Sequence, residues 1–569
     1  MKKNERVSRP DQTPPDGYLR ALEWEFLLSP FLLGLYFPWS SALMSTALVV
    51  LLLVLQINQG IRLPRSPVFL AAASLVLFLL AGGVWGCDRG MAAVGAVKFM
   101  PLPLFVLALE QFPADRRAGL LRRLPAVACV MVPAALLLSF IKPEEGWFLV
   151  SGRQAGFFQY PNTYALYLLC ALAILLFGEV PKIGIVRWTE VLILGIGVLL
   201  SGSRTGFIFL FFLLVFYLCV ERNRKKRRTL LMLTAILACG LVLFIILTGD
   251  RKSVGRFLTI SLSSSEMLGR LLYARDALPV IVTHPFGLGY WGYFWLQGSF
   301  QSGVYSVTHI HNELLQLLLD VGWIPAVFFL WALLRFFKHN GHNFYRSVPA
   351  ALICLHSLLD FDMQFVSMAM MLVLLTDTEP QASSGLKYRW PTIVILCCSA
   401  VFSIWIGLAS WENYMRDYRK AIRVYPAYTS AMADLLPQTA GDELETIADR
   451  VLSMNRNVSV AWDAKAIAAY ESGSLDQAIA YKERAVSLSR YNITEYKDMF
   501  YLLRLAYEEA FSAGDVQAAE EYLNRLEEIP RRLDAVRDGT SVLGWKIRDL
   551  PTLDLPEDYL IWLQAQRPA

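Results

Sequence analysis

The sequence predicts an all-α polytopic membrane protein, about two-thirds of it embedded in a bilayer, followed by a soluble helical domain. Hydrophobic residues make up 55% of the 569 residues and charged residues only 18%, whereas soluble domains carry about 25% charged residues. The composition also changes along the chain, since long apolar runs fill residues 21–409 and residues 410–569 read as an ordinary soluble protein. Lipid is therefore the expected solvent for the first part only.

Thirteen apolar segments are candidates for bilayer-spanning helices, which need about 20 mostly apolar residues. They are 22–38, 41–58, 67–86, 91–110, 122–141, 162–180, 188–201, 204–220, 229–249, 311–334, 346–359, 363–376 and 391–409. Three of them, 188–201, 346–359 and 363–376, are shorter than a full span. Short spans are expected to be tilted, broken or re-entrant against protein or a water-filled cavity. We therefore expect 12 or 13 transmembrane helices.

The distribution of Lys and Arg predicts the orientation of these spans. With the N-terminus in the cytoplasm, the cytoplasmic loops hold nineteen Lys and Arg and the short outer loops hold three. Because basic residues favour the cytoplasmic side, residues 1–20 are expected to be a disordered cytoplasmic tail and residues 410–569 to lie outside the bacterial cytoplasmic membrane. The strongest basic run, residues 222–228, is read as a topology anchor, and the net charge of +5 does not indicate nucleic-acid binding.

The soluble tail contains recurring helical segments. Segments 421–426, 450–456, 485–491 and 524–530 have related sequences, at a spacing of roughly 30 to 40 residues that is typical of helical repeats. Small residues in such segments let paired helices pack closely. The tail resembles degenerate tetratricopeptide repeats, which indicates an interaction surface for protein partners rather than a source of chemistry.

A long hydrophilic segment, residues 250–310, separates two groups of predicted spans. Loops of this length are usually functional or form a small domain. Within it, residues 266–283 carry apolar side chains at helical spacing. This pattern predicts an amphipathic helix on or near the outer membrane surface.

Three arginines lie near the outer membrane surface. Arg204 stands in the turn SGSRTG, Arg153 in the stretch GRQAGFFQYPN, and Arg270 in the predicted amphipathic helix. Guanidinium groups bind phosphate oxygens bidentately and keep their charge. The three arginines are therefore a candidate site for a phosphorylated lipid head group. The alternatives are a snorkelling anchor for Arg204, and a solvated or lipid-facing helix surface for Arg270 and Arg275.

Two histidines stand where the long outer segment enters a predicted span. A neutral imidazole such as that of His309 or His311 can take a proton from an acceptor hydroxyl, because its pKa lies near working pH. The alternatives are a structural pair and a metal site. Zinc needs three or four ligands, and no Cys or further His stands nearby in the sequence, so we expect no metal.

A carboxylate follows further along the chain. His356 and Asp360 are four residues apart, so they share one face of a helix and could hydrogen-bond. Asp360 could orient a catalytic histidine, bind sugar hydroxyls, or cap the break between two short spans. The eight Cys lie almost entirely in apolar runs without a CxxC pair, which favours small core hydrophobes over a disulfide or metal framework.

These stretches together resemble the O-antigen ligase and polymerase superfamily of bacterial membrane glycosyltransferases. The order of the motifs, their spacing and the long outer segment all correspond to that family. The motifs that carry the resemblance are SGSRTG at 201–206, GRLLYARDALPVIVTHPFGLGY at 269–290, HIHNELLQLLLDVGW at 309–323 and HSLLDFDMQF at 356–365. The resemblance implies a GT-C-like membrane fold, and many members carry an outer repeat domain.

The resemblance also implies a reaction. The donor is glycan on undecaprenyl pyrophosphate, and an acceptor glycan, lipid or protein displaces the lipid pyrophosphate at the outer leaflet without a cofactor. Arg204 and Arg270 correspond to the family's lipid-pyrophosphate arginines, and His311, with His309 beside it, to its proposed catalytic histidine. The motifs leave ligase, polymerase and protein O-oligosaccharyltransferase open. A transporter is disfavoured, because no inverted repeat is visible and the charges cluster at the outer edge of the spans.

Overall fold

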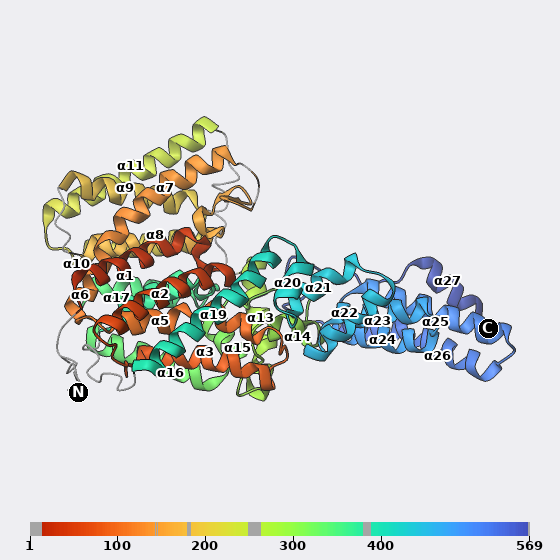
Figure 1. Ribbon diagram of the computed structural model, residues 1–569. Helices are drawn as coiled ribbons and strands as arrows, with labels where there is room; N and C mark the ends of the chain where they lie inside the picture. Colours follow the sequence, from red (N-terminus) through yellow and green to blue (C-terminus); the bar gives the residue numbers. More distant parts are fainter. Residues whose placement is uncertain are drawn as a thin grey trace, which may run out of the picture.

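The computed structural model describes residues 14–142, 144, 146–178, 184–248, 263–378 and 389–566. Most of this chain is helical, and two parts are visible in Figure 1: a bundle of helices, and a narrower tail that extends from one end of it. Helices α13, α14 and α15 lie at the end of the bundle that carries the tail, and α6 lies at the opposite end. The first thirteen residues of the expected cytoplasmic tail, and residues 249–262 at the start of the long outer segment, lie outside the described residues.

The bundle extends from α1 to α19, and five segments among its described residues are long and apolar enough to cross a membrane: Pro38–Asn58, Pro67–Trp85, Ala92–Leu109, Ala114–Ile141 and Arg389–Tyr414. Shorter apolar helices are Pro161–Phe177, Arg204–Val220 and Val366–Thr376. The described helices before residue 249 are α1 (Asp16–Leu28), α2 (Pro38–Asn58), α3 (Pro67–Trp85), α4 (Ala92–Phe99), α5 (Pro101–Leu109), α6 (Ala114–Ala118), α7 (Leu124–Ile141), α8 (Pro161–Phe177), α9 (Gly184–Leu200), α10 (Arg204–Val220) and α11 (Arg224–Thr248). Together these features confirm a helical, multi-pass membrane protein.

The second half of the bundle forms around shorter helices. They are α13 (Ser265–Thr283), α14 (Gly292–Phe300), α15 (Glu313–Val321), α16 (Trp323–Asn340), α17 (Phe344–His356), α18 (Val366–Thr376) and α19 (Arg389–Tyr414). The expected amphipathic helix is present as α13, capped by the Ser264 hydroxyl, which accepts from the Met267 amide. Its apolar side chains pack with those of α15 rather than facing lipid alone.

The predicted span 22–38 is not a continuous helix. Helix α1 begins within the expected disordered tail and ends at Leu28, and two 3₁₀ turns follow, η1 (Ser29–Phe31) and η2 (Leu33–Leu35). Gly34 has a φ of 63°, and a Cβ at this position would lie 2.6 Å from the Phe158 ring. The close approach and the left-handed backbone together break the span, and they bring Tyr36 to the end of the bundle that holds α13.

The predicted span 311–334 is also divided. Helix α15 ends at Val321, and α16 starts at Trp323. Gly322 between them has a φ of 74°, and a Cβ there would lie 2.2 Å from the Pro285 carbonyl oxygen. Only glycine fits this junction, and the break allows α15 to leave the direction of α16 and pack against α13.

The tail is a series of helices in which consecutive members pack against one another. They are α20 (Tyr418–Val424), α21 (Thr429–Leu435), α22 (Gly441–Met454), α23 (Ser459–Glu471), α24 (Leu475–Leu488), α25 (Ile493–Ser512), α26 (Val516–Asp538) and α27 (Glu557–Gln566). A separate apolar core joins α23 to α27. A helical domain after residue 409 is thus observed, and its assignment to the tetratricopeptide class stays a prediction.

Candidate functional site

A buried carboxylate lies at the centre of the polar cluster near α13. Asp360 stands in the turn between α17 and η5 (Asp362–Gln364), and its side chain is only 2% exposed. Its Oδ1 accepts from the Tyr160 hydroxyl at 2.8 Å, and its Oδ2 accepts from the Asn162 amide at 2.7 Å. Two cationic or ionisable partners, His311 and Arg270, complete the set. One carboxylate therefore joins four side chains from three separate parts of the sequence.

His311 is held in an unusual backbone conformation. Its φ is 56°, a left-handed value that non-glycine residues rarely adopt and that is often found at functional sites. The next residue, Asn312, caps α15 by accepting from the Leu315 amide at 3.0 Å. These local constraints direct His311 Nδ1 to Asp360 Oδ1 at 3.1 Å. The His311 side chain is 23% exposed, so the ring is oriented by the protein and still accessible to a substrate.

The charge of Asp360 is stabilised by its neighbours. Burial alone raises the pKa of the Asp360 carboxyl, but the hydrogen bond and charge of His311, together with the positive Arg270, hold that pKa below its usual range. The carboxylate therefore stays ionised near pH 7. With an Nδ1–H donated to this anion, the lone pair of His311 lies on Nε2, where it can accept a proton.

Two of the three predicted arginines approach this carboxylate. Arg270 Nη2 on α13 lies 3.5 Å from Asp360 Oδ2. Arg153 stands on a two-stranded hairpin, β1 (Leu149–Val150) with β2 (Arg153–Gln154), whose turn residues Ser151 and Gly152 both have positive φ. The Arg153 Nη2 donates to Asn162 at 2.7 Å, and Asn162 in turn donates to Asp360.

Arg204 does not contact Asp360. It opens α10, where the Ser203 hydroxyl accepts from the Gly206 amide, and its Nη1 lies 3.5 Å from Glu266 of α13. Glu266 precedes Arg270 by one helical turn on α13. The preceding turn also touches Arg153, because Arg153 Nε donates to the Ser201 carbonyl at 3.0 Å. The three arginines thus lie around one region, with Arg204 at its edge.

His309 belongs to a different environment from His311. It is buried, and its Nε2 lies 3.3 Å from the Tyr36 hydroxyl. Burial lowers the pKa of His309 well below its usual value, and the charges of Lys98 and His311 act in the same direction. The Phe361 ring lies 5.2 Å from the His309 ring and 5.0 Å from the His311 ring. His309 is therefore a neutral ring that contacts Tyr36 and Phe361 rather than Asp360.

The expected pairing of His356 with Asp360 is wrong. His356 Nδ1 instead lies 2.6 Å from Asp362 Oδ2, and the Asp362 side chain also accepts from the Thr163 and Ser357 hydroxyls. The helical register that would align His356 with Asp360 is lost because α17 ends at His356. The two neighbouring aspartates therefore have different roles. Asp362 accepts hydrogen bonds that hold the turn together, and Asp360 binds His311 and Arg270.

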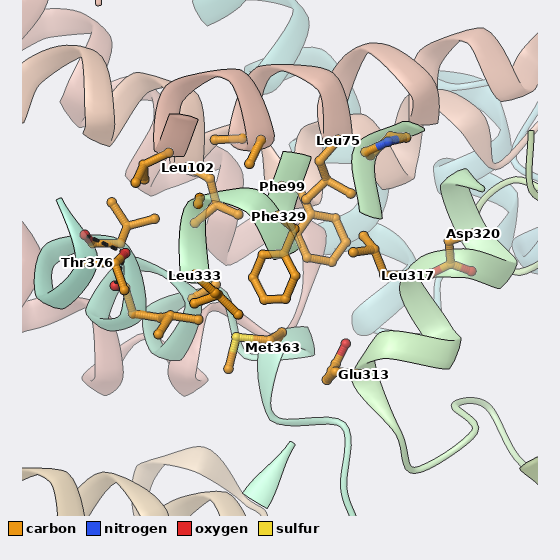
Figure 2. Close-up of a pocket in the computed structure, with 18 of the residues that line it drawn as sticks. Leu75, Phe99, Leu102, Glu313, Leu317, Asp320, Phe329, Leu333, Met363 and Thr376 are labelled. Atoms are coloured by element: carbon orange, nitrogen blue, oxygen red, sulfur yellow. Dashed lines mark hydrogen bonds between the residues drawn. The ribbon is translucent and has the colours of Figure 1, made fainter. Parts of the chain in front are cut away.

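An apolar cavity of about 110 Å³ lies among α3, α5, α15, α16 and α18. Figure 2 shows Phe99 and Phe329 side by side in its middle, Thr376 at one end and the carboxyl groups of Glu313 and Asp320 at the other. The cavity walls are otherwise mostly leucine, valine and alanine side chains. Because Glu313 follows His311 by two residues, the cavity approaches the Asp360 cluster from inside the bundle.

Sequence reasoning missed the two residues that connect this site. Tyr160 and Asn162 both donate hydrogen bonds to Asp360, and Asn162 also accepts a hydrogen bond from Arg153. The available signal was their position in the stretch GRQAGFFQYPN, immediately before α8, where polar groups precede a buried helix. The partner of each could not be read from the sequence, because Asp360 lies about 200 residues further along.

The fold and the site define a multi-pass membrane protein with a cationic and imidazole cluster around one buried carboxylate. Residues 191–330 match the O-antigen ligase family. That segment contains Arg204, Arg270, His309 and His311, whereas Arg153 and Asp360 lie outside it. The match supports the O-antigen ligase superfamily and, with it, a membrane glycan ligase or polymerase type of function. No curated protein matches the chain.

Proposed function

We propose that this protein transfers glycan from an undecaprenyl-pyrophosphate carrier to an acceptor hydroxyl at the outer face of the bacterial cytoplasmic membrane. The observation that carries the proposal is the hydrogen bonding of Asp360 to both His311 and Arg270. One carboxylate thereby fixes a candidate base and a candidate phosphate ligand relative to each other. Such fixed geometry is what a displacement at an anomeric carbon requires.

The residues divide the reaction between them. Arg270, with Arg153 and Arg204 around it, binds the pyrophosphate oxygens and stabilises the charge that develops as the carrier leaves. His311 Nε2 takes the proton from the acceptor hydroxyl. The acceptor oxygen forms a bond to the anomeric carbon while the bond from that carbon to the pyrophosphate oxygen breaks, and its electron pair leaves with the lipid pyrophosphate. Displacement opposite the leaving group inverts the anomeric centre.

The apolar cavity supports a lipid-linked donor. Its walls are suited to isoprenoid units, because burial of apolar surface is favourable and needs no specific polar partner. Its end at Glu313 approaches the residues that would hold the pyrophosphate. The carrier chain would then enter from the membrane while its head group reaches Arg270.

The position of the basic run supports the proposed orientation. Helix α10 starts at Arg204, beside Glu266 of α13, and ends at Val220 just before the basic run 222–228. A helix of this length spans about 25 Å, so the run lies roughly a membrane thickness from the site. Basic residues favour the cytoplasmic side, which supports a site on the outer side of the membrane.

The proposal is tested with purified full-length protein and lipid-linked glycan extracted from the source organism. We expect His311→Ala and His311→Gln to lose transfer by about 10²–10⁴-fold, the usual contribution of a general base, and to keep donor binding. Arg270→Ala should weaken donor binding at least about tenfold, because a hydrogen bond to a charged group contributes ~1.5–3 kcal/mol. His284→Ala and Arg275→Ala, which change exposed residues of the same region, are the matched controls.

Two results would contradict this assignment. Near-wild-type transfer by stably folded His311→Gln removes the base, since glutamine forms hydrogen bonds but does not take up a proton near neutral pH. Equal donor binding by Arg270→Ala and Arg275→Ala removes the phosphate site. The glycan phenotype of a deletion strain then separates the classes, because a polymerase loss shortens chains and a ligase loss leaves full-length chains on the carrier.

A further inference from the structure

A second cavity, of about 280 Å³, lies where the tail meets the bundle. Tyr36, Trp291 and His309 line it from the bundle, and Tyr418, Tyr428 and Asp434 line it from the tail. Tyr418 opens α20, and the other two tail residues flank or lie on α21. The cavity is therefore complete only when the first tail helices are docked on the bundle.

This cavity adjoins the Asp360 cluster without being part of it. His309 lines the cavity, whereas His311, two residues on, bonds Asp360. The Phe361 ring contacts both histidine rings. A ligand in the cavity would therefore lie close to the residues of the Asp360 cluster.

The cavity walls contain buried polar atoms that lack a partner. Within the described residues, His309 Nδ1 and Asn413 Oδ1 are buried and form no hydrogen bond. Both residues line the cavity. Buried polar groups are ordinarily hydrogen-bonded, and an exception calls for an explanation. Both atoms have almost no accessible surface, so a ligand with hydroxyl groups, which can donate and accept, would satisfy them once the side chains around them rotate.

The remaining lining favours a neutral sugar over an anion. Aromatic side chains dominate the walls, and an aromatic ring offers an apolar face with a polar hydroxyl at its edge in tyrosine. The charged side chains have both signs, since Lys98 and Arg416 are accompanied by Asp434. The Lys98 ammonium is already bonded to Gln364 at 2.9 Å. A pyranose presents C–H faces for the rings and hydroxyls for the polar groups.

We infer that this cavity binds a neutral sugar ring of the acceptor, and that the tail supplies part of its wall. The inference rests on the proposed transfer function and adds the acceptor subsite to it. The tail then contributes acceptor binding, although it carries neither the candidate base nor the phosphate ligands. Tyr418 and Asp434 are specificity-determining residues in this assignment, and His309 faces the acceptor while His311 takes its proton.

The test measures sugar binding without transfer. Saturation-transfer NMR is recorded on purified full-length protein with methyl glucoside, methyl galactoside, methyl mannoside and methyl N-acetylglucosaminide, one at a time. At least one glycoside should bind the wild type. Tyr418→Ala and Asp434→Asn should each reduce its signal at least fivefold. Tyr470→Ala and Asp442→Asn, which change exposed tail residues away from the cavity, are the matched controls and should bind as the wild type does.

Each outcome decides for or against the cavity. The inference is overturned if none of the four glycosides binds the wild type, if the cavity and control variants bind equally, or if inorganic pyrophosphate competes with the bound glycoside. Asp434→Asn changes an exposed carboxylate and is expected to fold, so it remains informative if Tyr418→Ala does not. Failure of the proposed function looks different: transfer persists in His311→Gln and Arg270→Ala, while glycoside binding and its loss in the cavity variants are unchanged.

Discussion

Replacement of Asp360 by asparagine tests the connection between the candidate base and the candidate phosphate ligand. Oδ1 of Asp360 accepts hydrogen bonds from His311 and Tyr160, and Oδ2 accepts them from Arg270 and Asn162. In Asp360→Asn, one of these oxygens becomes an NH₂ group. Whichever oxygen is replaced, two donors then face a donor, and the negative charge that both His311 and Arg270 contact is gone.

The magnitude follows from those partners. Hydrogen bonds to charged groups contribute ~1.5–3 kcal/mol each, and two of the four side-chain bonds, those of His311 and Arg270, involve a charged or ionisable donor; the Phe361 amide donates a fifth bond to Oδ1. A loss of about 3 kcal/mol in the transition state corresponds to at least a ~100-fold fall in kcat/KM. Tyr160→Phe removes one hydrogen bond to the same carboxylate and keeps the carboxylate charge, so it should cost about tenfold, the lower end of the ~1.5–3 kcal/mol range for a bond to a charged group.

The assay is steady-state transfer by the purified variants, with donor KM and kcat measured separately. The donor KM should rise through Arg270 and kcat should fall through His311, a split that a merely destabilised fold does not produce. The pKa of Asp360 is depressed, so the stability that its charge contributes is present above the unfolded value of about 3.9 and is lost as pH falls further. Assays between pH 5 and 8 therefore keep the wild-type carboxylate charged. Folded Asp360→Asn with kcat/KM within tenfold of the wild type would refute the role of this carboxylate.

Two further predictions concern orientation and stability. In a cysteine-free background, single cysteines at Ser299 and Asp515 should react with a membrane-impermeant thiol reagent in intact cells; labelling at either position only after the membrane is opened contradicts the proposed topology. Arg117→Ala should destabilise the protein by about 3–5 kcal/mol, because it removes the guanidinium that forms an ion pair with the fully buried Asp377 carboxylate. The neighbouring exposed pair of Arg116 with Asp16 is the control, since Arg116→Ala should cost no more than about 1 kcal/mol, and equal thermal midpoints for the two variants would contradict the prediction.

Hydrophobic length predicted the helical membrane fold well, and it failed where a single residue overrides it. The run 22–38 is mostly apolar, with Glu23 and Glu25 near its start, yet Gly34 and its contact with Phe158 divide it. The run 311–334 is mostly apolar after a polar start, and Gly322 divides it where Pro285 of another segment approaches. In both cases the deciding contact is with a residue far away in the sequence, so hydropathy alone cannot reveal the break.

The candidate site was partly predictable for a related reason. His311, Arg270 and Asp360 were recognisable as polar groups at the ends of apolar runs, where a charge is costly and calls for a function. The pairing was not recognisable, and the helical spacing of His356 and Asp360 pointed to the wrong bond. Helix α17 ends at His356, so the residues after it do not keep the helical spacing. Asp360 therefore hydrogen-bonds to His311 instead of His356.

The repeats in the sequence predicted that the tail is an interaction surface. In the structure, the first helices of the tail pack against the bundle. Asp88, in the turn after α3, accepts from the Thr429 hydroxyl at 2.8 Å and from the Asn455 amide at 3.2 Å. A Cβ on Gly90 would lie 2.0 Å from the Ala427 carbonyl oxygen, so the two backbones are in direct contact.

A second junction lies at α14, where the Arg490 amide donates to the Gly298 carbonyl and the Ser541 amide donates to the Ser302 carbonyl. The bundle therefore holds the tail both at its first helices and further along its length. A sequence repeat indicates how neighbouring helices of the tail pack on one another. It does not indicate that the first tail helices also pack against the membrane bundle. Helices α20 and α21 therefore contribute to the cavity beside His309, and we expect the later helices to offer the larger surface to a protein partner.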